Sequence, residues 1–349
     1  MPSDQAPTRP LQTRGGTGTR PMPVQPADVP PPVAPPAPVR PPVRPQETMP
    51  DRPSPAPRAP GLGAVRLAPR VVAAAVAVGA GLLAWMVWRY FVDTYAGQMA
   101  ERAAFDGAVN GQGPLWAVAE PVLDTVSVTL VVVGLGAAMG IALLRRRWGL
   151  AVQVAFLVVG ANVTTQLVKH DLLGRDNLIG GWTADNSLPS GHTTVAASVA
   201  AALLLVVPRR ARPLVAVLGG AYTAATGVST LVGQWHRPSD VVAAVLVVLA
   251  WGALVCAFTP RSALDRGAGG SPGSVVTSVL LLLVAAGASA AALWAYRATP
   301  ATWETTTAQE ATAYVGGVAG VGAATAAVFA VLLLVRQSTA RPDPRAVRG

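Results

Sequence analysis

The chain has 349 residues, of which 52% are hydrophobic and 13% are charged, and its mean hydropathy is +0.44. This composition is too apolar for an ordinary water-soluble protein of that length and predicts an integral membrane protein. The net charge of +10 is spread over span ends and tails instead of forming one basic face, so we expect no nucleic-acid partner. The single cysteine, Cys256, excludes an intramolecular disulfide and a cysteine metal site.

Residues 1–65 are expected to form a proline-rich, disordered cytoplasmic tail. Residues 1–60 hold 20 of the 32 prolines and almost no aromatic or long apolar side chain. Such a segment cannot bury a core. A docking role for a proline-binding partner is the alternative to a plain solvated tail.

The rest of the chain predicts an all-α, polytopic membrane helix bundle with about eight transmembrane helices. A bilayer core of about 30 Å needs roughly 20 apolar residues per helix. Eight apolar windows approach this length, at residues 69–92, 121–144, 149–168, 193–207, 213–231, 240–258, 274–296 and 311–335. We expect a six-span domain at residues 66–260, two additional spans at residues 261–336, and a disordered cytoplasmic tail at residues 337–349.

Arginines set the expected topology, because they follow every second predicted span and dot the N-terminal tail. The positive-inside rule places these segments, and both termini, in the cytoplasm of a bacterial cell whose plasma membrane holds the protein. The alternate loops are then extracytoplasmic, at residues 93–120, 169–192, 232–239 and 297–310.

All three histidines, His170, His192 and His236, fall at extracytoplasmic span ends. One such histidine is usually a half-solvated interfacial side chain, but three on one face indicate a site. Lys169, the one lysine among 27 basic residues, lies beside them. Six residues later, the planar guanidinium of Arg175 suits bidentate contact with phosphate oxygens. The two cations predict an anion site.

The segment Pro-Ser-Gly-His, at residues 189–192, opens the fourth predicted span. Ser190 can cap the helix that follows, and Gly191 lets the backbone approach a ligand closely. Backbone N–H groups at a helix N-terminus bind anions. Beside them, His192 can donate a proton to a leaving oxygen and later take one from water.

His236 and Asp240 stand four residues apart at the start of the sixth predicted span. A carboxylate at this spacing can accept a hydrogen bond from one ring nitrogen, which leaves the other nitrogen free to attack an electrophile. No metal-binding motif accompanies the pair, so we expect no metal and no cofactor. The residues favour metal-free phosphoryl transfer through a histidine nucleophile.

Over roughly residues 69–258, these motifs resemble the type 2 phosphatidic acid phosphatase superfamily, the lipid phosphate phosphatases. The Pro-Ser-Gly-His motif is intact, and Ser229, His236 and Asp240 stand at the family spacing. The resemblance implies that His236 forms a phosphohistidine, that Asp240 orients it, and that His192 acts as acid and then as base. It also implies a phosphate-binding set made of Lys169, Arg175, Ser190, Gly191 and Ser229.

The chain departs from the family signature at three points. Five residues instead of six separate the lysine and arginine of the first motif, and Asp176 replaces the proline after that arginine. Thr230 stands where the family has a second arginine, so one donor to the phosphate is missing. Our hypothesis is that Arg237 or Gln234, in the same loop, partly replaces it.

The sequence therefore predicts a phosphatase acting on a lipid phosphate or a polyprenyl pyrophosphate. A site at span ends can receive the headgroup while the hydrocarbon tail stays in the bilayer. Two alternatives stay open. One is a phosphotransferase, in which an acceptor alcohol replaces water. The other is a non-enzymatic lipid-binding relative, favoured by Asp176 and Thr230. The oligomeric state is not predicted.

Overall fold

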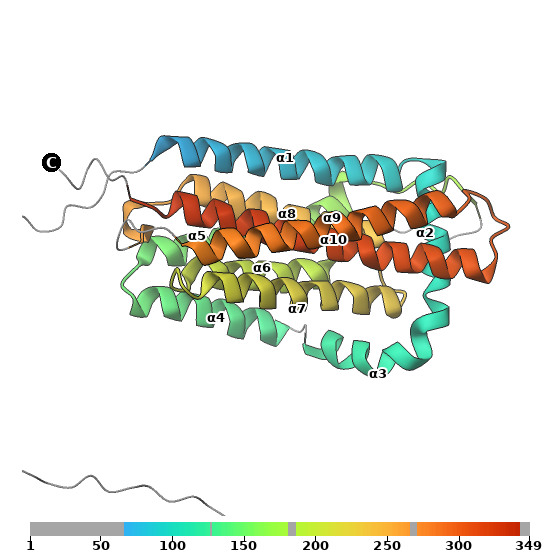
Figure 1. Cartoon of the computed structure of the whole chain (residues 1–349), viewed down its shortest axis with the longest axis horizontal. Helices are drawn as coiled ribbons and strands as arrows, with labels where there is room; N and C mark the ends of the chain where they lie inside the picture. The colour runs from blue at the N-terminus through green and yellow to red at the C-terminus, as the bar shows by residue number, and fades with distance from the viewer. Residues whose placement is uncertain (1–65, 126–127, 181–185, 266–270, 343–349) are drawn as a thin grey trace, which may run out of the picture. The chain divides into compact units, whose positions relative to one another are not determined.

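The computed structural model describes residues 66–125, 128–180, 186–265 and 271–342. The predicted tail at residues 1–65 and residues 343–349 of the C-terminal tail lie outside this range. The described residues form an all-α structure without a β-sheet, as predicted (Figure 1). Their ten α-helices are α1 (Leu67–Phe91), α2 (Tyr95–Gly107), α3 (Val109–Thr125), α4 (Val128–Leu144), α5 (Trp148–Leu167), α6 (Gly191–Val206), α7 (Arg212–Val232), α8 (Pro238–Ala257), α9 (Pro272–Ala298) and α10 (Thr307–Thr339).

Six helices of the described structure are long and apolar enough to cross a membrane, so the chain is a multi-pass membrane protein. They are α1, α5 together with the short π-helix that continues it (Val168–Leu172), α7, α8, α9 and α10. The two other predicted spans correspond to the shorter helices α4 and α6, of 17 and 16 residues. A count of eight crossings therefore stays a prediction.

Local sequence explains why α6 is short. The second predicted span, at residues 121–144, includes residues 126–127, which lie outside the described residues, so its length cannot be compared with that of α4. Helix α6 is bounded on both sides: the hydroxyl of Ser190 caps its N-terminus, and Pro208 follows its C-cap residue, Val207. Val207 has an extended conformation, which a following proline favours.

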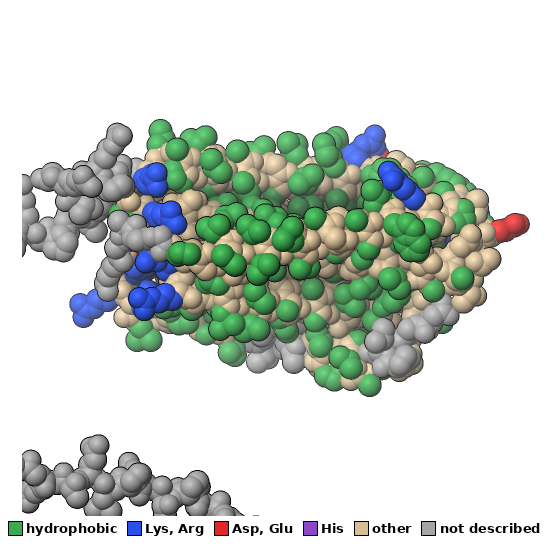
Figure 2. All heavy atoms as spheres, viewed as in Figure 1, with side chains coloured by type: hydrophobic (Ala, Val, Ile, Leu, Met, Phe, Trp, Pro, Cys, Tyr) green, Lys and Arg blue, Asp and Glu red, His purple; other side chains and the backbone are tan. Residues whose placement is uncertain are grey.

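Helix α8 is the most buried of the six long helices. It packs against α1, α5, α6 and α10, and its buried side chains are mostly alanine and valine, which let helices approach closely. In contrast, most of α1 and α9 is exposed, as expected for helices that face lipid. Figure 2 shows hydrophobic side chains along the length of the bundle and basic side chains gathered mainly at one end. The burial of α8 fixes the position of its N-terminus, which carries the His-Asp motif.

The segment at residues 93–120, expected to be a loop, contains α2 and most of α3. Thr94 caps α2 by accepting a hydrogen bond from the N–H of Gly97 at 3.0 Å. Polar and apolar side chains of α2 are both buried, because the helix packs against α1, α8 and α10. A short helix with so many polar residues gives no apolar window in the sequence.

The two C-terminal helices α9 and α10 pack along each other, and α10 also contacts α2, α7 and α8. Helix α10 continues to Thr339, so residues 337–339 of the predicted tail are helical. Long-range contacts hold this end of the helix: the buried side chain of Arg336 donates to the carbonyl of Leu205 at 3.1 Å, and Gln337 accepts from Arg212 at 3.1 Å.

Candidate active site

Four helix termini bring the predicted site residues to the same end of the bundle. The π-helix that ends α5 carries Lys169, the N-terminus of α6 carries His192, the C-terminus of α7 carries Ser229, and the N-terminus of α8 carries Asp240. Two of these termini are helix N-termini, whose dipoles favour negative charge.

The side chains of His236 and Asp240 form the centre of the site. Nδ1 of His236 lies 3.1 Å from Oδ2 of Asp240, as the four-residue spacing predicts. The same oxygen accepts hydrogen bonds from the hydroxyl of Ser187 at 2.6 Å and from the N–H of Arg237 at 2.9 Å. Asp240 is completely buried and His236 is nearly so. The carboxylate is therefore held by three contacts, and the ring of His236 is oriented through its Nδ1.

The ring of His192 lies near that of His236, with centroids 6.3 Å apart and an angle of 69° between the planes. The ring of Trp235 also lies near that of His192, at a centroid distance of 5.5 Å. The N–H of Ser190 donates to the carbonyl of Asp240 at 2.9 Å, so the N-termini of α6 and α8 are joined directly. This backbone contact brings two motifs that are distant in sequence to one place.

Thr230, the residue that replaces the family arginine, is completely buried near the end of α7. Its hydroxyl donates to the carbonyl of Gly227 at 2.7 Å. Its carbonyl accepts from the N–H groups of Trp235 and His236 at 3.0 and 3.3 Å. In this chain, position 230 therefore closes the turn that holds the histidine.

The two side chains proposed to replace that arginine both have protein partners. Gln234 donates to the carbonyl of Phe105 at 2.7 Å and accepts from Gln112 at 3.1 Å, which directs it toward α2 and α3. Arg237 donates to the hydroxyl of Ser187 at 2.8 Å. Replacement of the missing donor by either residue stays a prediction.

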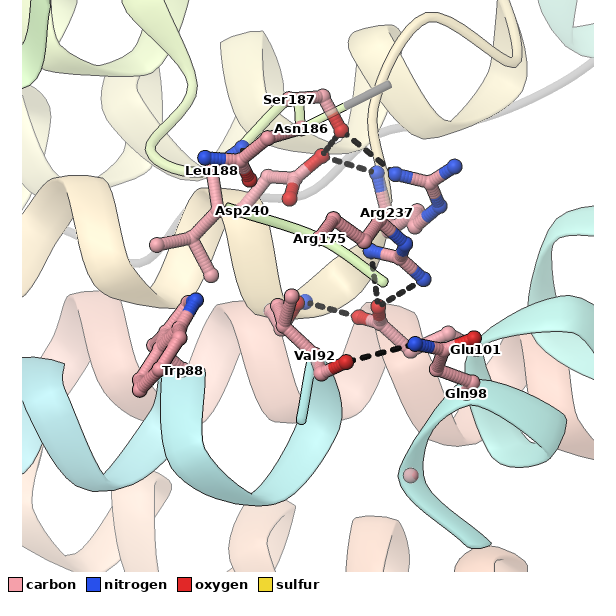
Figure 3. A network of polar contacts seen from close by, with 12 residues as sticks. Trp88, Val92, Gln98, Glu101, Arg175, Asn186, Ser187, Leu188, Arg237 and Asp240 are labelled. Carbon is pink, nitrogen blue, oxygen red and sulfur yellow. Dashed lines mark hydrogen bonds and ion pairs between the residues drawn. The ribbon is translucent and has the colours of Figure 1, made fainter. Parts of the chain in front are cut away.

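Arg175 lies on the segment after the π-helix, against Glu101 of α2 (Figure 3). Its two terminal nitrogens are 3.4 and 3.5 Å from Oε2 of Glu101, and both side chains are almost completely buried. Oε1 of Glu101 accepts from the N–H of Ser239 at 3.1 Å. Burial, reinforced by repulsion from Asp240, raises the pKa of Glu101 to about 7, although Arg175 and Ser239 oppose the shift.

The remaining predicted residues lie around this centre. Lys169 is half-buried and close enough to His192 for their charges to interact. Gly191 is the first residue of α6, and Ser229 is buried near the end of α7. His170 is exposed on the π-helix, and nothing brings it to the other two histidines. Among the described residues, no group of three or more histidine, cysteine, aspartate or glutamate side chains could hold a metal ion.

Sequence reasoning missed three residues of the site: Gln98, Glu101 and Ser187. Gln98 and Glu101 lie one helical turn apart on α2, in a segment expected to be a loop. The threonine cap at residue 94, followed by polar residues at helical spacing, is the signal that could have found them. Ser187 precedes the Pro-Ser-Gly-His motif, and no spacing rule links it to Asp240.

Comparison with known families gives one match: residues 160–264 match the PAP2 superfamily. Neither comparison with curated proteins nor comparison with solved structures gives a match. The matched range runs from the second half of α5 past the end of α8 and includes all eight predicted site residues, but not α2. The chain is therefore a multi-pass membrane protein that carries a PAP2 superfamily domain at residues 160–264.

Proposed function

We propose that this protein is a membrane phosphatase that hydrolyses a lipid phosphate or a polyprenyl pyrophosphate through a phosphohistidine intermediate. The observation that carries the proposal is the 3.1 Å contact between Nδ1 of His236 and Oδ2 of Asp240, beside the ring of His192. PAP2 superfamily proteins are typically metal-independent phosphatases, which agrees with a nucleophile supplied by the chain itself.

In the first step, Nε2 of His236 attacks phosphorus, and the bond from phosphorus to the leaving oxygen breaks. His192 gives its proton to that oxygen, so the lipid leaves as a neutral alcohol or as the shorter phosphate. Positive charge that develops on His236 is stabilised by the buried carboxylate of Asp240.

In the second step, water attacks phosphorus and the bond from phosphorus to Nε2 breaks. His192, now neutral, takes the proton from that water, and inorganic phosphate leaves. Lys169, Arg175 and the N-terminal N–H groups of α6, next to Ser190, hold the phosphoryl oxygens. Ser229 completes this predicted cradle.

Two apolar pockets near the site favour a lipid substrate. One, of about 280 Å³, lies between α1, α5 and α8 and reaches Leu188 and Pro189. The other, of about 380 Å³, is lined by α1, α2, α8, α9 and α10 and reaches Pro238 and Ser239. Pockets with apolar walls beside a phosphate-binding end suit a headgroup attached to a hydrocarbon chain.

The charge distribution supports an extracytoplasmic site, and the membrane proposed is a bacterial plasma membrane. The end of the bundle opposite the site carries the arginines that follow the predicted spans, and the positive-inside rule assigns that end, with both termini, to the cytoplasm. Residues 66–260 then form the phosphatase domain, and residues 261–336 form an additional pair of spans.

The direct test is release of inorganic phosphate by purified protein in detergent, with a chelator present, from phosphatidic acid and from a polyprenyl pyrophosphate. We expect release by the wild type and none by His236→Ala. His170→Ala is the matched control, because this histidine is exposed and outside the site. Equal rates for wild type and His236→Ala would contradict the proposal.

The same assay separates the alternatives. With an acceptor alcohol present, a phosphotransferase forms a phosphorylated acceptor in place of inorganic phosphate, and His236→Ala blocks both products. A non-enzymatic lipid-binding relative binds the lipids and releases no phosphate from any of them.

A further inference from the structure

The segment that carries Arg175 is held by hydrogen bonds from α2 and α1, two helices that lie outside the PAP2 match. The side chain of Gln98 donates to the carbonyl of Asp176 at 2.6 Å and accepts from the N–H of Leu178 at 3.2 Å. On the other side of Arg175, the carbonyl of Gly174 accepts from the indole N–H of Trp88 at 3.1 Å. The backbone on both sides of Arg175 is therefore held by residues outside the matched range.

Glu101, one turn after Gln98, makes the direct connection between α2 and the site. One of its oxygens faces the guanidinium of Arg175, and the other accepts from the N–H of Ser239, in the first turn of α8. Asp240, the partner of His236, is the next residue. A single buried side chain thus contacts a predicted phosphate ligand and the first turn of the helix that carries the catalytic pair.

Arg102, the residue after Glu101, anchors α2 on another side. Its guanidinium donates to the carbonyl of Trp303 and to the hydroxyl of Thr305, both at 3.1 Å, and lies 4.5 Å from the centre of a Trp303 ring. Trp303 and Thr305 belong to the connection between α9 and α10. Helix α2 is therefore fixed between the C-terminal helices and the site.

We propose that Glu101 is a positioning residue of the phosphatase site, whose ionised carboxylate holds Arg175 and the N-terminus of α8 in the geometry needed for phosphate binding and for attack by His236. The proposal rests on the proposed function. It also gives the C-terminal pair of helices a structural role, because α10 and the connection between α9 and α10 contact α2 and hold it in place.

The role depends on charge. An ionised carboxylate forms an ion pair with Arg175 and accepts the N–H of Ser239, whereas a protonated one loses the ion pair. The charged groups that act on Glu101 are Arg175 from the loop, Arg237 at the N-cap of α8, and Asp240 in its first turn. Because burial raises the pKa of Glu101 to about 7, the pair is complete above neutral pH and is lost below it.

The test is the pH profile of kcat/KM for wild type and Glu101→Gln, since glutamine resembles the protonated acid at every pH. We expect the variant to be about tenfold less active than the wild type above pH 8, from the loss of a charge-assisted contact, and the two to converge below about pH 6. A ratio that does not change with pH would show a merely structural role and overturn the proposal. Equal activity at every pH would also overturn it.

Asp106→Asn is the matched control. Asp106 lies on the same helix, and its carboxylate is also 3.4 Å from an arginine, Arg102, but it does not contact the site. Its profile should follow the wild type throughout. A double-mutant cycle with Arg175→Gln adds a second readout: because Glu101 acts largely through Arg175, the double variant should be little worse than Arg175→Gln alone. Additive losses would contradict this route.

A binding measurement without turnover distinguishes a failure of the proposed phosphatase function from a failure of the positioning role of Glu101. Vanadate, titrated calorimetrically into wild type and Glu101→Gln, should bind more tightly to the wild type at pH 8 and equally at pH 6. This pattern would support the positioning role even if no lipid in the panel is hydrolysed. Equal affinities at both pH values would overturn it.

Discussion

The two ends of the helix bundle each bury a carboxylate against arginine, with different geometry. At the end opposite the site, Asp265 accepts from the two terminal nitrogens of Arg212 at 2.7 and 2.8 Å, and Arg147 lies 3.6 Å away. At the site end, Glu101 faces one guanidinium, that of Arg175, at 3.4 and 3.5 Å. The first pair is short and bidentate, whereas the second is long.

The pKa values of the two carboxyl groups shift in opposite directions. Burial acts to raise the pKa of Asp265, but the hydrogen bonds and charge of Arg212 outweigh it and hold that pKa below its ordinary value. Burial and the nearby Asp240 instead raise the pKa of Glu101 to about 7. Asp265 therefore stays ionised at neutral pH, whereas Glu101 titrates close to neutral pH.

The largest expected effect is a loss of activity without a loss of stability, from a substitution at the site end. His236→Ala removes the proposed nucleophile, so kcat/KM for the proposed hydrolysis of a lipid phosphate should fall by at least about 1,000-fold. The melting temperature in detergent should change little, since the opposite end is untouched. Phosphate release combined with a thermal melt checks both expectations. A variant that melts far below the wild type would show that His236 is mainly structural.

The next largest effect is a loss of stability without a loss of activity, at the end opposite the site. Asp265→Asn leaves the buried guanidinium of Arg212 without its carboxylate, which we expect to destabilise the fold by about 3 kcal/mol. The specific activity of the protein that remains folded should be unchanged. Thermal unfolding followed by an assay of the soluble fraction measures both. If Asp265→Asn lost activity but kept its stability, the expectation that this end of the bundle has only a structural role would be contradicted.

Residues with one-dimensional signatures could be predicted from the sequence. Apolar windows gave the helical membrane fold, and the spacing of His236 and Asp240 predicted a contact that the structure contains. The Pro-Ser-Gly-His motif likewise predicted the cap of α6 by Ser190. The windows depend on one continuous stretch of chain, and the contact and the cap depend on neighbours within four residues, where helix periodicity decides the geometry.

Features that depend on long-range packing could not be predicted. Glu101 meets Arg175 across 74 residues of sequence, and Ser187 meets Asp240 across 53. The arginines after the predicted spans were interpreted as topology signals, yet Arg147, Arg212 and Arg336 are buried. Positive charge near a span end looks the same in sequence whether it faces lipid headgroups or a buried carboxylate such as Asp265.

A smaller effect is the pH dependence of the folding stability, which should differ between the carboxyl groups of Glu101 and Asp265. Because the pKa of Glu101 is raised from 4.5, its contribution favours the folded state below about pH 4.5 and is lost as pH rises through about 7. Glu101→Gln lacks this titration, so its melting temperature relative to the wild type should rise by a few degrees between pH 5 and 8. Asp265 has a lowered pKa, so its stabilisation persists at neutral pH and is lost only in acid. A constant difference between Glu101→Gln and wild type would contradict the titration.

The smallest effect concerns Ser187, whose hydroxyl donates to Oδ2 of Asp240 at 2.6 Å and accepts from Arg237 at 2.8 Å. In Ser187→Ala the carboxylate keeps its bonds to the ring of His236 and to the N–H of Arg237. We therefore expect kcat/KM to fall by about fivefold, which corresponds to one hydrogen bond of about 1 kcal/mol.

Ser338→Ala is the control for that change, because this hydroxyl donates to a carbonyl within α10, at the end opposite the site. It should leave kcat/KM unchanged. If Ser187→Ala were as inactive as Asp240→Asn, the carboxylate would depend on the hydroxyl for its orientation, and the two remaining donors would not suffice to hold it. If Ser187→Ala were fully active, the carboxylate of Asp240 would be positioned by the backbone of α8 and by His236 alone. The rigidity of the catalytic pair would then come from the burial of α8 and not from the loop that precedes α6.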